Sequence, residues 1–121
     1  MAGVQAANLL LDSGKKAEAR TMLTSVVEGS KASSFYQVHT RFILIGLLED
    51  DQKFDEALAQ IAALEKISDK ELKPKILLAK GRIQILKKSS KDAVGTLTKL
   101  INDFGTSAEA KKARSLRALI N

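Results

Sequence analysis

Apolar residues recur every three or four positions along nearly the whole chain, which is the spacing of amphipathic helices. No segment shows sustained alternation of apolar and polar residues, and the hairpin pairs Asn-Gly and Asp-Gly do not occur. The pattern therefore predicts an all-α protein. We expect seven helices, over residues of about 2–12, 15–28, 33–50, 53–67, 69–87, 90–103 and 107–119.

Local signals define several of these helices. The segment at 33–50 is apolar on nearly all sides, so we expect it to be the central and most buried helix. Residues 68–71 and 106–109 have the spacing of capping boxes and open the fifth and seventh helices. Pro74 falls in or just after the first turn of the fifth helix, where a missing amide costs least. Because the connections are short, neighbouring helices should be antiparallel.

An internal repeat joins the helices in pairs. An acidic residue followed by an alanine opens the second helix of each pair, and these alanines, Ala19, Ala57 and Ala93, are 38 and 36 residues apart. Bulky apolar residues follow each alanine after four and seven positions, and they are Leu23, Val26, Ile61, Leu64, Leu97 and Leu100. A small residue lets two helices approach closely, and the later residues fill the groove between them. Pairs of this kind bury their faces by stacking into a solenoid.

This spacing resembles the tetratricopeptide repeat. The run Phe54-Asp55-Glu56-Ala57 is the closest match to the turn of that family, and Gly81 stands at its glycine position in the third unit. The resemblance implies a right-handed solenoid of about three helical hairpins and a C-terminal capping helix, in a single domain over 1–121. The implied repeats cover about 2–31, 32–68 and 69–105, and the closing helix covers 106–120.

A second resemblance concerns the C-terminal part. The run from Ile101 to Ser107, followed by Ala110 and Ala113, is similar to the tail of bacterial envelope repeat proteins, which include outer-membrane assembly lipoproteins and membrane-anchored translocon accessory proteins. It implies a periplasmic protein, or a membrane-anchored one that faces the periplasm, with the cytoplasm as the alternative. The longest apolar run, 42–48, is far shorter than the roughly 20 residues that span a bilayer.

Charge divides the chain into two parts. Residues 1–69 carry a net charge of −3 and residues 70–121 a net charge of +9. A basic half attracts acidic proteins, nucleic acids or anionic lipids. Stacking of nucleic-acid bases usually needs aromatic side chains, and the basic half has only Phe104. The charge therefore favours an acidic protein partner over nucleic acid.

The residues that usually carry catalysis or bind metals are scarce. The chain has no cysteine, and its one histidine is His39. The carboxylates of residues 49–51 lack the alternating oxygen ligands of a calcium loop. We therefore expect a protein without enzyme activity, metal or cofactor.

The resemblance to tetratricopeptide proteins implies that the first helix of each pair lines a concave groove. The residues placed there as partner-binding candidates are Asn8, His39, Phe42, Lys75, Leu78, Arg82, Lys111 and Arg114. Such a groove would hold a partner segment with acidic side chains or a free carboxylate. Two alternatives stay open. The acidic N-terminal half could stack on the basic half of another copy, or the basic half could bind an anionic polymer or lipid.

Overall fold

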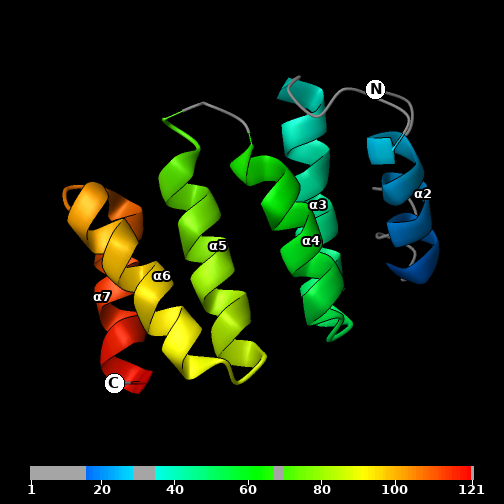
Figure 1. The fold of residues 1–121 in the computed structure, drawn as a ribbon. Helices are drawn as coiled ribbons and strands as arrows, with labels where there is room; N and C mark the ends of the chain where they lie inside the picture. Colours follow the sequence, from blue (N-terminus) through cyan, green and yellow to red (C-terminus); the bar gives the residue numbers. More distant parts are fainter. Residues whose placement is uncertain (1–15, 29–34, 67–69, 121) are drawn as a thin grey trace. The chain divides into compact units, whose positions relative to one another are not determined.

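The computed structural model describes residues 16–28, 35–66 and 70–120, and every regular element among them is a helix (Figure 1). The prediction of an all-α protein is confirmed. The helices are α2 (Lys16–Glu28), α3 (Phe35–Asp50), α4 (Phe54–Glu65), α5 (Lys73–Leu86), α6 (Ser90–Asp103) and α7 (Ala108–Ile120). The predicted helix at 2–12 lies outside the described residues.

The chain divides into two compact units, Met1–Ile67 and Ser68–Asn121. In unit 1, α3 packs against both α2 and α4. Its buried apolar residues are Val38, Leu44, Ile45, Leu47 and Leu48. Within unit 1, the helix that the sequence marks as apolar on nearly all sides therefore lies between its two partners.

Unit 2 consists of three helices that all contact one another, because α5 packs against α6 and α7, and α6 packs against α7. Its core is formed by the buried residues Leu77, Leu97, Leu100 and Ala113. The helices α5 and α7 run in the same direction, and α6 runs opposite to both (Figure 1). This arrangement places two parallel helices side by side on one face of unit 2.

The repeat positions are among the most completely buried of the described residues. Ala19, Ala57 and Ala93 have no exposed surface. The apolar residues that follow them are also buried, namely Leu23, Ile61, Leu64, Leu97 and Leu100. The side chain of Val26 lies outside the described part of the chain. The predicted burial of these repeat positions is therefore confirmed.

The turn between α3 and α4 is reproduced 36 residues later between α5 and α6. Gln52 and Lys88 each have a positive φ, of 61° and 67°. The next residues are Lys53, with φ −93° and ψ 65°, and Ser89, with φ −95° and ψ 63°. In each turn the amide of this next residue donates to the carbonyl five residues earlier over 2.8 Å. Both helices thus end in the same left-handed cap, although neither has the glycine that usually stands there.

Two expected helix starts differ from those observed. The helix α5 begins at Lys73 rather than near residue 69, and Pro74 is its second residue, where its missing amide breaks no helical hydrogen bond. The N-terminus of α7 is capped by Ser107, whose Oγ accepts a hydrogen bond of 3.0 Å from the amide of Ala110. The capping box predicted at 106–109 is therefore wrong. It placed the capping hydroxyl on Thr106, one residue before the observed Ser107.

Polar contacts connect the helices of unit 1. Arg20 of α2 forms an ion pair with Asp51, just after α3. Arg41 of α3 donates a hydrogen bond from Nη1 to Oε1 of Gln60 on α4. Burial lowers the pKa of the Arg41 guanidinium from its ordinary value, because the charged form loses solvation. The group remains a cation at neutral pH.

Candidate functional site

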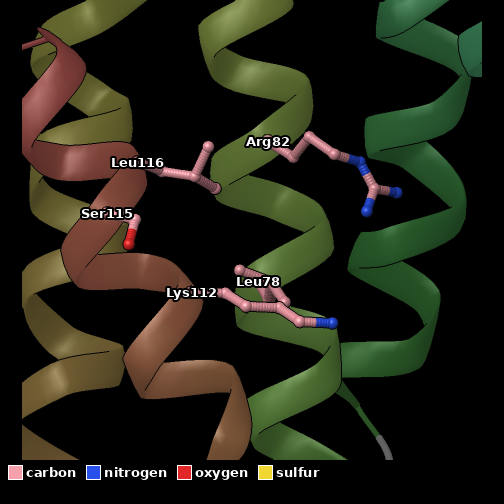
Figure 2. Close-up of a pocket in the computed structure, with 5 residues that line it drawn as sticks. All are labelled: Leu78, Arg82, Lys112, Ser115 and Leu116. Carbon is pink, nitrogen blue, oxygen red and sulfur yellow. The ribbon is translucent and has the colours of Figure 1, made fainter.

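A pocket of about 330 Å³ opens between α5 and α7 of unit 2 (Figure 2). Leu78 and Arg82 line it from α5. Lys112, Ser115 and Leu116 line it from α7, and Leu116 extends toward α5. The pocket therefore combines two apolar side chains, one hydroxyl and two cations.

Helical spacing explains why these residues line one pocket. Leu78 and Arg82 are four residues apart on α5, and Lys112 and Leu116 are four residues apart on α7. Residues at this spacing lie on one face of a helix. The two faces meet because α5 and α7 pack directly against each other.

The floor of the pocket continues into the hydrophobic core of the unit. Leu78 and Leu116 pack, half-buried, against a buried cluster that includes Leu77 and Ala113. Ala113 is the residue that α7 contributes to this buried cluster. The two leucines thus present apolar surface that an incoming side chain could cover without any rearrangement of the core.

The helices that form the pocket are strongly basic. Their exposed or half-exposed charged residues are Lys73, Lys75, Lys80, Arg82, Glu109, Lys111, Lys112, Arg114 and Arg117. Eight of these nine are cations, and Glu109 is the single acid. A surface of one sign attracts groups of the opposite sign from a distance. The pocket is therefore suited to carboxylates combined with an apolar group.

The groove residues predicted from the sequence do not all line the pocket. Leu78 and Arg82 line the pocket, and the exposed Lys75 precedes Leu78 by three residues on α5. Lys111 is exposed but does not belong to the pocket lining. Arg114 donates a hydrogen bond of 2.9 Å from Nη2 to the carbonyl of Gly105, so it holds the turn between α6 and α7.

The remaining predicted residues do not belong to unit 2. His39 is exposed and Phe42 is half-buried, and both lie on α3 of unit 1. Asn8 lies outside the described residues. The pocket accordingly contains two of the eight predicted groove residues.

Sequence reasoning missed Lys112, Ser115 and Leu116. The family resemblance placed Lys111 and Arg114 in the groove instead. The sequence alone did not mark the inner face of α7, because Ala108 and Ala118 are exposed whereas Ala110 and Ala113 are fully buried. With the two buried alanines on the inner face, helical geometry places Lys112 and Leu116 at its edge.

Two further observations bear on the type of site. Among residues 16–28, 35–66 and 70–120, no group of three or more His, Asp or Glu side chains is placed to hold a metal ion. None of the helices in the described ranges is long and apolar enough to cross a membrane. No protein-family model, curated protein or solved structure matches the chain.

Proposed function

We propose that this chain is a non-catalytic protein-binding scaffold that captures a segment of a partner protein in the pocket between α5 and α7. The observation that carries the proposal is the pairing of an apolar floor, Leu78 and Leu116, with the cations Arg82 and Lys112. An apolar side chain of the partner covers the leucines, while its carboxylates pair with the cations. Charge-assisted hydrogen bonds are the stronger kind and favour this pairing.

The proposed architecture is a right-handed solenoid of about three tetratricopeptide-like hairpins with a closing helix. Two observations support it. The turns after α3 and after α5 share the same backbone geometry at a period of 36 residues. Within unit 2, α5 and α7 are parallel and both pack on α6, as consecutive first helices of stacked hairpins would.

The C-terminal resemblance supports a role in protein assembly or translocation in the bacterial envelope, with the pocket facing the periplasm. Fractionation of the native cell with an antibody against the chain tests this part. Recovery in the periplasmic or membrane fraction supports it, and recovery in the cytosol alone contradicts it. The binding proposal itself is independent of the compartment.

The binding proposal is tested by affinity capture with three forms of the full chain. The first is the wild type, and the second carries Arg82→Glu and Lys112→Glu. The third carries Lys91→Glu and Lys99→Glu, which make the same charge change at exposed positions of α6. A protein bound by the first and third forms but lost from the second supports the pocket, once purified partner reproduces the difference. Equal capture by all three forms contradicts it.

Charge asymmetry favours one other function, which is self-association. The unequal charges of the two parts of the sequence, −3 over 1–69 and +9 over 70–121, would attract opposite ends of two copies. Light scattering against protein concentration and salt separates the two functions. An apparent mass that rises with protein concentration and falls with added salt would favour self-association over partner binding.

A further inference from the structure

Two large hydrophobic side chains are exposed in the described part of the chain. Leu86 is 45% exposed, and Leu119 is 81% exposed. Isolated exposed leucines are common, but here both lie on the helices that form the pocket. Their positions on those helices therefore bear on what the pocket binds.

Both leucines extend the faces that line the pocket. On α5, Leu86 follows Arg82 by four residues, as Arg82 follows Leu78. On α7, Leu119 follows Leu116 by three residues. Each leucine thus lies one turn beyond the pocket on the same side of its helix. Because α5 and α7 are parallel, their C-terminal ends lie at the same end of unit 2 (Figure 1), and each leucine stands within two residues of such an end.

The result is a strip with two apolar contact points. The first is formed by Leu78 and Leu116 in the pocket, and the second would consist of Leu86 and Leu119, which are exposed near the C-terminal ends of α5 and α7. Leu78 and Leu86 are eight residues apart, which is about 12 Å along a helix axis. A partner helix covers nearly the same distance in seven residues, about 10.5 Å.

The chemistry of the lining discriminates between an extended segment and a helical one. The walls are helices, so their backbone groups are already paired within α5 and α7. Among the five lining residues, Arg82 and Lys112 only donate hydrogen bonds, and Ser115 offers the one side-chain acceptor. An extended segment would therefore lack partners for its amides, whereas a helix satisfies its own.

We infer that the occupant of the strip is an acidic amphipathic helix of a partner protein. Apolar residues seven positions apart in this helix contact the two pairs of leucines, and its carboxylates face Arg82 and Lys112. The surplus of cations on α5 and α7 is the charge complement of such a helix. This inference rests on the proposed protein-binding function and specifies the shape and charge of the bound segment.

Two synthetic peptides of identical composition test the inference, each about four helical turns long. The first peptide places leucines at helical spacing among glutamates, with two of them seven residues apart. The second peptide alternates leucine and glutamate strictly, which suits an extended segment. Fluorescence anisotropy measures the binding of each to the full chain at fixed salt. We expect the helical peptide to bind at least tenfold more tightly.

The variants Leu86→Ser and Leu119→Ser locate the binding. Each should weaken the helical peptide by about fivefold or more, because a contact worth over about 1 kcal/mol is lost. Ala118→Ser, at an exposed position beside Leu119, is the matched control and should leave binding unchanged. Circular dichroism confirms that the variants keep their helices.

The outcomes separate the inference from the proposed function. If the alternating peptide binds better and loses affinity on Arg82→Glu with Lys112→Glu, the function stands and the helical occupant is wrong. The same holds if the helical peptide binds but ignores both serine substitutions. If neither peptide binds, or a single-stranded oligonucleotide binds in their place, both the inference and the proposed function are overturned.

Discussion

Gly81 of α5 lies directly against Leu97 of α6. A Cβ atom built on Gly81 would be 2.6 Å from Cδ2 and 3.0 Å from Cγ of that leucine. Real Cβ atoms do not approach other carbon atoms this closely, and Leu97 is fully buried in the core of unit 2. The glycine is therefore required by close packing of the two helices, because its helical backbone would accept any residue.

The first prediction follows from this contact. Alanine favours a helix over glycine by up to about 1 kcal/mol, but overpacking a core costs about 1–3 kcal/mol. We expect Gly81→Ala to lower the free energy of unfolding by about 1 kcal/mol. Urea denaturation followed by circular dichroism measures the change.

Gly95 on α6 provides the matched control. It is exposed, and a Cβ atom there would meet nothing within 4 Å. Gly95→Ala should therefore raise the free energy of unfolding by up to about 1 kcal/mol through helix propensity alone. If the two substitutions stabilise the chain equally, the proposed close contact between Gly81 and Leu97 is wrong.

The second prediction concerns the alanine of the repeat. Ala57 of α4, a helix that packs against α3, is fully buried, whereas Ala59 is exposed two residues later on the same helix. Ala57→Leu should lower the free energy of unfolding by about 1–3 kcal/mol, because the helices must move apart. Ala59→Leu should change it by less than about 0.5 kcal/mol. Thermal unfolding of both variants gives the comparison, and equal effects would contradict the packing role.

The third prediction concerns the left-handed caps. Lys88 has a φ of 67°, where a side chain is strained and glycine is not. Lys88→Gly should therefore raise the free energy of unfolding by about 0.5–1 kcal/mol. The neighbouring Lys87, with a φ of −76°, has an ordinary helical backbone. Lys87→Gly should lower the same free energy by about 0.5–1 kcal/mol, and a loss at both positions would refute the explanation.

Helices such as α4 and α6 were predictable because each carries its own apolar periodicity. The expected helix at 90–103 agrees with α6 at both ends. The start of α5 was misplaced, since Lys70 and Glu71 are as polar as a helix start but form a turn. The caps at Gln52 and Lys88 were also missed, because glycine is the usual sequence signal for a left-handed residue and both positions lack it.

The pocket was predictable only in part. On α5, the family resemblance placed Lys75, Leu78 and Arg82 in one groove, and Leu78 and Arg82 line the pocket. On α7, charged residues lie on both sides of the buried face. Composition therefore did not show which of them line the pocket. The structure resolves this, since Ala110 and Ala113 are buried and Arg114 is bonded to Gly105.

The last prediction compares two adjacent lysines of α7, of which one lines the pocket and the other does not. Lys111 and Lys112 are adjacent, exposed and equal in charge, but only Lys112 belongs to the pocket lining. Lys112→Glu and Lys111→Glu change the net charge of the chain identically, so long-range attraction changes to a similar extent in both. The two variants therefore differ mainly in the contact that the side chain makes with a bound segment.

We expect Lys112→Glu to weaken binding of the acidic helical peptide by about tenfold, since an opposing charge becomes a like charge at short range. Lys111→Glu should weaken it by no more than about twofold at physiological salt, where charges beyond about 8 Å are screened. Anisotropy titrations at two salt concentrations measure both effects. Equal losses that disappear together at high salt would show that the peptide responds to overall charge rather than to the pocket.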